Sequence, residues 1–263
     1  MTLLGSDAVL VGLTAIIYWC FDKRRGRLAT YILFLGAYLN FFLKILIPWP
    51  RPPFELRIVG RDLVDYGFPS GHAQDSSTFW SWISLDFKKR SLAVLGTLIV
   101  LAVGISRVYL GVHYPGQVIG GWLIGFAVAA LGMLVLRRLP AQDRGLRSSR
   151  QMLFAFTTLI PLMISVGLGA VGDVNAGLVG GYLFAFSLGA IVEDRYVGLM
   201  TEISWSKKIL RTLIGIGIVG LLVLAMSRIL PMSSVTSSFV NSSIRGLAVS
   251  LIAPAVFKLI EKK

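Results

Sequence analysis

Long apolar stretches recur along the whole chain and are separated by short polar connections, most of them basic. Several approach the roughly 20 residues that a helix needs to cross a hydrocarbon core about 30 Å thick. The stretches predicted as helices are residues 3–21, 28–48, 70–86, 91–111, 115–137, 151–171, 175–192, 208–229 and 241–258. The pattern therefore predicts an all-α fold, a polytopic transmembrane bundle of about nine helices.

The third and ninth stretches are the least hydrophobic of the set. Residues 70–86 include His72, Asp75 and several serines. Polar residues within a membrane protein face the protein interior rather than lipid, so we expect neighbouring helices to cover this one. Residues 3–21 lack a basic leader and a small-residue cleavage site, which predicts a retained first helix rather than a signal peptide.

Composition supports a membrane protein. Of the 263 residues, 55% are hydrophobic and only 15% are charged, and the mean hydropathy is +0.75. A soluble domain of this length does not carry so much apolar surface. The net charge of +13 does not indicate nucleic-acid binding, because the basic residues lie in short loops where they orient helices. The single cysteine, Cys20, cannot form an internal disulfide.

The basic residues alternate between the two predicted sides of the membrane. Seven of the 26 lysines and arginines fall on the poorer side: Lys44, Arg51, Arg57, Arg61, Arg107, Arg228 and Arg245. Because cytoplasmic loops are enriched in such residues, the N-terminus is predicted outside and the C-terminus in the cytoplasm. The short chain and short loops favour a prokaryotic plasma membrane.

A basic linker is predicted at residues 139–150 and divides the chain into two parts. Residues 1–138 would form a catalytic transmembrane core, because they contain every candidate functional residue. Residues 151–263 would form a set of C-terminal transmembrane helices without catalytic residues.

Three polar clusters stand at helix ends on the predicted outer side: residues 44–52 (KILIPWPRP), 69–72 (PSGH) and 106–117 (SRVYLGVHYPGQ). They contain Lys44, Arg51 and Arg107, three cations on the side that membrane topology leaves poor in positive charge. A shared anion site explains all three. Taken singly, Lys44 and Arg51 also fit a lysine that snorkels to the interface and an arginine that binds lipid headgroups.

The PSGH cluster has the features of an anion-binding helix start. Free backbone amides at a helix N-terminus favour negative charge, Ser70 offers a hydroxyl, Gly71 permits a close backbone approach, and His72 stands in the first turn. The alternative is an N-cap beside an incidental histidine.

The third cluster holds the only other histidine, His113. Gln117 lies four residues further on, and its side chain can reach back to the imidazole. A histidine with one ring nitrogen held by a fixed acceptor exposes the other as a nucleophile or base. The alternative is a histidine at the membrane interface whose hydrogen bonds are satisfied and which has no catalytic role.

These motifs resemble the three-part signature of the type 2 phosphatidic acid phosphatase (PAP2) superfamily: Lys, six residues, Arg-Pro; then Pro-Ser-Gly-His; then Ser-Arg, five residues, His. The superfamily includes glucose-6-phosphatases, vanadium haloperoxidases and polyprenyl diphosphate phosphatases. The resemblance covers about residues 40–125. The stretch 192–197 (VEDRYV) resembles the appended helices of some microbial members more weakly.

The resemblance implies a phosphatase in which His113 attacks phosphorus and forms a phosphohistidine, while His72 protonates the leaving oxygen. The phosphate oxygens would be held by Lys44, Arg51, Ser70, Gly71 and Arg107. No metal or other cofactor is expected, since cations take that role, and the sequence has no carboxylate pair or His-Cys spacing typical of a metal site.

One position departs from the family pattern, in which aspartate commonly stands four residues after the nucleophile. Gln117 can accept the bond from His113 and fix its tautomer, but it offers no negative charge. Glucose-6-phosphatases and dolichyl diphosphatases resemble this glutamine form. Asp75 is an alternative carboxylate that would assist either histidine, or a helix-start acid favoured by the helix dipole.

The resemblance and the topology predict an integral membrane enzyme with membrane lipids as partners. Its substrate would be a lipid phosphate or diphosphate: polyprenyl diphosphate, which the glutamine form favours, phosphatidic acid or phosphatidylglycerol phosphate. Aromatic residues in the second connection would form an interfacial lip: Trp49, Phe54, Tyr66 and Phe68. Two alternatives are a phosphatase of a soluble sugar phosphate and a transporter or scramblase that uses the site to recognise headgroups.

Overall fold

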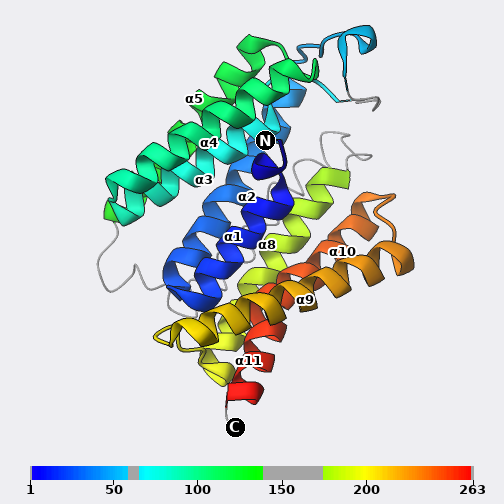
Figure 1. Ribbon diagram of the computed structural model, residues 1–263. Helices are drawn as coiled ribbons and strands as arrows, with labels where there is room; N and C mark the ends of the chain where they lie inside the picture. The colour runs from blue at the N-terminus through cyan, green and yellow to red at the C-terminus, as the bar shows by residue number, and fades with distance from the viewer. Residues whose placement is uncertain (1, 59–64, 139–173, 262–263) are drawn as a thin grey trace. The chain divides into compact units, whose positions relative to one another are not determined.

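The computed structural model describes residues 2–58, 65–138 and 174–261, and within these ranges it contains helices, turns and loops but no strand. The α-helices are α1 (Asp7–Cys20), α2 (Lys23–Leu46), α3 (Gly71–Phe87), α4 (Arg90–Tyr109), α5 (Pro115–Arg138), α8 (Val174–Val192), α9 (Trp205–Ile229), α10 (Val235–Leu247) and α11 (Ala253–Glu261) (Figure 1). The all-α prediction is confirmed. The predicted helix at 151–171 lies outside the described residues.

Six helices in the described part are long and apolar enough to cross a membrane: α2, α4, α5, α8 with the turn after it, α9, and the continuous run Val235–Glu261. Helix α1, with 14 residues, is shorter, since each residue adds only about 1.5 Å. Helix α2 begins at Lys23 rather than at residue 28, because lysine and arginine are good helix formers. The protein is an integral membrane protein.

The chain forms two compact units, one of Met1–Thr14 and Leu28–Pro140 and the other of Ala15–Arg27 and Ala141–Lys263. The helices α1 and α2 therefore contribute to both units. The expected division into a core, a linker at 139–150 and a C-terminal part stays a prediction, because the linker lies outside the described residues.

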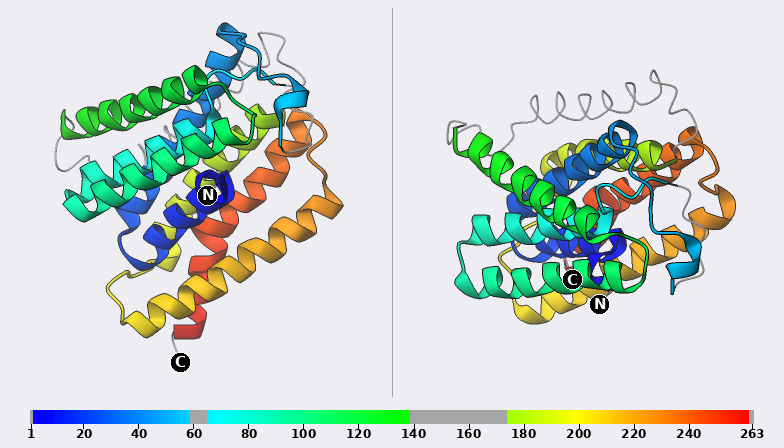
Figure 2. Two further views of the ribbon diagram at one scale, coloured as in Figure 1. Left: turned by 45° about the horizontal axis from the view of Figure 1, so that its top comes forward. Right: turned by 90° about the horizontal axis from the view of Figure 1, so that it is seen from above.

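Helix α3 is the centre of the first unit. It packs against both α4 and α5, and the three helices run side by side in all views (Figures 1 and 2). Gly121 and Gly125 allow the approach of α5, since a Cβ at Gly125 would stand 2.3 Å from the carbonyl oxygen of Gln74. The polar side chains of α3 between Gln74 and Thr78 are buried. The prediction that neighbouring helices cover α3 is confirmed.

Hydrogen bonds join α2 to α3, and the connection after α2 to the α4–α5 turn. Asn40 of α2 donates to the side-chain oxygen of Gln74 at 2.9 Å, and Gln74 donates to the carbonyl of Gly36 at 2.7 Å. The connection that follows α2 meets the α4–α5 turn, where the amide of Ile58 donates to the carbonyl of Leu110. Segments far apart in the sequence thereby meet at one end of the unit.

The second unit contains a buried ion-pair network around a π-helical turn, Glu193–Val197, that follows α8. The carboxylate of Glu193 is fully buried and accepts bonds from Lys23, from the Tyr18 hydroxyl and from the amide of Leu199. Arg27 binds the next carboxylate, Asp194, through two bonds of 2.6 Å. Polar groups buried in this way are stable only when paired, so the network fixes the α1–α2 turn to the C-terminal helices within this unit.

Candidate active site

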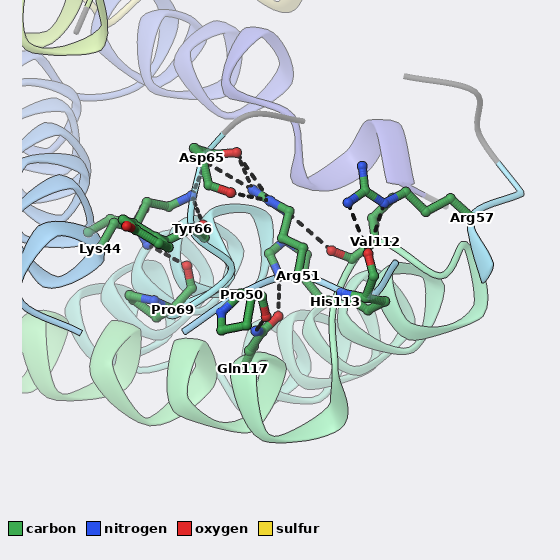
Figure 3. A network of polar contacts seen from close by, with 12 residues as sticks. Lys44, Pro50, Arg51, Arg57, Asp65, Tyr66, Pro69, Val112, His113 and Gln117 are labelled. Atoms are coloured by element: carbon green, nitrogen blue, oxygen red, sulfur yellow. Dashed lines mark hydrogen bonds and ion pairs between the residues drawn. The ribbon is translucent and has the colours of Figure 1, made fainter. Parts of the chain in front are cut away.

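Of the residues singled out from the sequence, Lys44, Arg51, His113 and Gln117 lie in one network of polar contacts in the first unit (Figure 3). Each of the residues singled out belongs to a helix end or to the connection beside it. They come from the end of α2 (Lys44), the connection after it (Arg51), the start of α3 (Ser70, Gly71, His72), the end of α4 (Arg107), the α4–α5 turn (His113) and the first turn of α5 (Gln117).

Gln117 joins the three motifs. Its side-chain oxygen accepts from the amide of Tyr114 at 3.2 Å, and its side-chain nitrogen donates to the carbonyl of Pro50 at 2.8 Å. Its backbone carbonyl accepts from the amide of Ser70 at 3.0 Å. An amide N–H can only donate and a carbonyl can only accept, so these partners fix the orientation of the fully buried side chain.

The orientation of Gln117 decides the tautomer of His113. The oxygen of Gln117 lies 3.1 Å from Nδ1 of His113, so Nδ1 carries the proton and donates it. The other ring nitrogen, Nε2, then presents a lone pair. Arg51 Nη1 lies 2.7 Å from Nε2 and donates to it (Figure 3).

The surroundings of His113 also keep it neutral. Burial, and after it the positive charge of Arg51, lower the pKa of His113 from its ordinary value near 6.5 to about 3, although the bond to Gln117 acts in the opposite direction. A neutral imidazole, which carries a lone pair on one ring nitrogen, is the form that acts as a nucleophile.

Lys44 and Arg51 meet at a residue that the sequence reasoning missed, Asp65. Lys44 donates to its carboxylate, and Arg51 Nη2 lies 2.8 Å from Oδ1 and 2.9 Å from Oδ2. Burial raises the pKa of Asp65, but the charges and hydrogen bonds of Lys44 and Arg51 outweigh it and hold the pKa below its ordinary value. The sequence offered only a weak signal: one of three acids, Glu55, Asp62 and Asp65, in the basic connection between two motifs.

Two buried donors of the cluster have no partner in the part of the chain that the structure describes. Among the described residues, neither the Ser70 hydroxyl nor Nε of Arg107 has a hydrogen-bond acceptor. A buried polar atom without a partner is costly, and such atoms need an explanation in a folded protein. Oxygen atoms of an anion are suitable acceptors for both.

His72 and Asp75 stand on the first turns of α3. The charges of Arg107, Arg51 and Lys44 act on His72, and the same three charges act on His113. The two imidazoles therefore share one positive environment. Asp75 is buried, and the described part of the chain gives it no hydrogen bond to either histidine.

In residues 2–58, 65–138 and 174–261, no three histidine, cysteine, aspartate or glutamate side chains are grouped as they would be around an ion. The positive charge of the cluster comes from its lysine and arginines.

Two models of known protein families match this chain. Residues 25–141 match the model of the PAP2 superfamily, and residues 178–263 match that of the PAP2 superfamily phosphatase, transmembrane extension. Together these models match more than half of the chain, and the chain belongs to the PAP2 superfamily.

Individual relatives resemble about half of this chain. An undecaprenyl-diphosphatase of Sulfolobus acidocaldarius is 30% identical over 48% of this chain and 55% of its own length. A phosphatidylglycerophosphatase B of Bacillus subtilis is 29% identical over 57% of this chain and 76% of its own. A crystal structure of a PAP2-type phosphatidylglycerolphosphate phosphatase from Bacillus subtilis is 27% identical over 53% of this chain and 75% of that one, with a TM-score of 0.47. The chain thus spans about half the length of the first of these relatives.

The state of His113 can be measured directly, because the chain has only two histidines. In a His72→Gln variant with ¹⁵N-labelled imidazole, we expect His113 to stay neutral with its proton on Nδ1 from pH 8 down to about pH 5. Its pKa of about 3 places protonation below that window. A midpoint near pH 6.5 in the NMR titration would contradict this assignment.

Two buried glutamines provide a test of the His113 tautomer and its matched control. In the same labelled background, Gln117→Met removes the acceptor for Nδ1, so a mixture of tautomers is expected. Gln74→Met removes an equally buried amide that does not contact His113, and the Nδ1–H tautomer should persist. Loss of the tautomer in both variants would mean that general packing, rather than Gln117, determines it.

Proposed function

We propose that this protein is a membrane phosphatase that removes phosphate from a lipid phosphate or diphosphate through a phosphohistidine intermediate on His113. The observation that carries the proposal is the arrangement of that imidazole. Its Nδ1 proton is held by Gln117, and its Nε2 lone pair faces a group of cations. This is the requirement for a nitrogen nucleophile directed at an electron-rich phosphate.

The cations and the neutral hydrogen-bond donors of the cluster would stabilise the negative charge of the phosphate during the reaction. Lys44, Arg51 and Arg107 would bind the equatorial oxygens, and the Ser70 hydroxyl and the Gly71 amide at the start of α3 would add neutral donors. Charge that develops on these oxygens is stabilised by donors fixed in a partly buried site, which is commonly the largest contribution to such catalysis. No step in this scheme requires a metal ion.

The two histidines account for every bond and proton in the proposed reaction. Nε2 of His113 forms a bond to phosphorus as the bond between phosphorus and the leaving oxygen breaks, and His72 gives its proton to that oxygen. A water molecule then attacks the phosphohistidine while His72 accepts a proton from it. Orthophosphate leaves with the new P–O bond, and Nε2 regains its lone pair.

A lipid is the substrate class that suits the site. The cluster lies at helix ends, and the connection after α2 exposes Trp49, Phe54 and Tyr66, side chains that anchor at a membrane interface. The named activities of the relatives, on undecaprenyl diphosphate and phosphatidylglycerophosphate, favour the same class. We infer an extracytoplasmic site from the distribution of basic residues and a prokaryotic plasma membrane from the short loops. The glutamine at position 117 favours polyprenyl diphosphate as the leading substrate.

Phosphate release tests the proposal. Purified protein in detergent with a metal chelator should release orthophosphate from a prenyl diphosphate or from phosphatidic acid faster than from a sugar phosphate. His113→Ala should abolish this release, since no other group replaces the nucleophile. Release that persists in the variant would exclude His113 as the nucleophile.

The same assay separates the alternatives. Preference for a sugar phosphate would favour the soluble-substrate enzyme. Absence of turnover on every ester, together with lipid flux in vesicles, would favour a transporter or scramblase.

A pair of arginines tests the role assigned to the cations. Arg107 and Arg228 each lie in the last turn of a long apolar helix, α4 and α9 respectively, but only Arg107 belongs to the cluster. Arg107→Gln should lower kcat/KM on the order of 10²-fold, the usual effect of removing one donor to a transition-state oxyanion. Arg228→Gln should leave kcat/KM within about twofold. Equal losses in both variants would show a general effect of surface charge.

A further inference from the structure

Asp65 occupies the position between two of the cations that the proposed function assigns to phosphate. Its carboxylate accepts from Lys44 and receives a two-pronged contact from Arg51 through Nε and Nη2. Arginine binds carboxylate and phosphate with the same fork geometry. The contact is therefore of the kind that a phosphate would make with the same side chain.

Arg51 has no hydrogen left for a second anion. A guanidinium has five N–H groups. Nε and Nη2 donate to Asp65, while Nη1 donates to the carbonyl of Val112 at 3.1 Å and to Nε2 of His113 at 2.7 Å (Figure 3). Binding of phosphate by Arg51 therefore requires that an existing partner leave. Engagement of Nε2 also occupies the lone pair that would attack phosphorus.

Asp65 is the partner that can leave most easily. Its side chain is 45% exposed, whereas that of Arg51 is 8% exposed. A carboxylate at this position can turn toward water and be solvated there. The Val112 carbonyl belongs to the backbone of the α4–α5 turn, and the His113 ring is held by Gln117.

We propose, on the basis of the proposed function, that Asp65 is an internal competitor that binds Lys44 and Arg51 in the absence of substrate and is displaced by the incoming phosphate. Its departure frees Arg51 for the phosphate oxygens and thereby releases Nε2 of His113. Its return after hydrolysis assists the release of orthophosphate. Asp65 thus weakens the binding of any small anion that lacks further contacts, and it favours substrates whose lipid tail contributes to binding.

Orthophosphate is the probe that tests this proposal. If the site is open to phosphate in only a fraction of the protein molecules, the apparent affinity for phosphate is reduced by that fraction. Removal of a competitor that occupies the site most of the time should therefore tighten phosphate binding. In Asp65→Asn we expect orthophosphate to inhibit turnover at a concentration at least about tenfold lower than in the wild type. Asp65→Ala provides a second variant with the same expected direction.

Glu55→Gln is the matched control. Glu55 is an exposed acid of the same connection, and no ion-pair partner for it is found among the described residues. Its substitution removes the same charge and should change inhibition by less than about twofold. An equal gain in Glu55→Gln would show that net charge, and not occupancy of the site, governs affinity.

A positioning role for Asp65 gives the opposite result. If its carboxylate holds Lys44 and Arg51 in their working geometry, Asp65→Asn and Asp65→Ala lower kcat/KM and weaken orthophosphate binding. Unchanged or weaker binding in both variants, with thermal unfolding like that of the wild type, would overturn the competitor role.

The proposed function and this inference can fail separately. Direct orthophosphate binding, measured by ³¹P NMR in a His113→Ala background with and without Asp65→Asn, does not depend on turnover. If the wild type hydrolyses lipid phosphate and Asp65→Asn does not bind phosphate more tightly, only the competitor role fails. If no ester is hydrolysed but Asp65→Asn binds phosphate more tightly, only the catalytic function fails.

Discussion

A single buried glutamine holds the three motifs of the site in register. Gln117 bonds to the carbonyl of Pro50, to the amide of Ser70 through its own carbonyl, and to Nδ1 of His113. The Tyr114 amide can only donate to the side chain and the Pro50 carbonyl can only accept from it, so the side chain has one orientation, and that orientation leaves the lone pair of His113 on Nε2. A carboxylate at position 117 would supply negative charge but would face the Pro50 carbonyl with no proton to give.

The same end of the unit gathers positive charge that would be unstable by itself. Burial lowers the pKa of Arg51, which reflects the cost of placing a cation away from water. Asp65 neutralises part of this charge through its ion pairs with Lys44 and Arg51. A phosphate would carry more negative charge to the same place and would offer acceptors to the Ser70 hydroxyl and Nε of Arg107, which have none among the described residues. The cations proposed to bind phosphate are thus the same groups that need Asp65 as a counter-ion.

Much of the fold and of the candidate site could be predicted from the sequence, since the helix positions follow from the lengths of the apolar stretches and the three motifs have fixed spacing. The reach of Gln117 to His113 followed from a separation of four residues. The bond of Gln117 to Pro50 and the role of Asp65 could not be predicted, because both depend on how loops far apart in sequence pack. Nothing in the local sequence distinguishes Asp65 from Glu55. The pairing of Lys23 and Arg27 with Glu193 and Asp194 was hidden for the same reason.

The central claim is that Lys44, Arg51, Arg107 and His113 surround one tetrahedral anion. The most direct test is an experimental structure of the protein with orthovanadate, which adopts the five-coordinate geometry of phosphoryl transfer. We predict vanadium bonded to Nε2 of His113, its equatorial oxygens contacted by the three cations, and the Asp65 side chain turned away. Vanadate bound elsewhere, or bonded to His72 instead, would contradict the account.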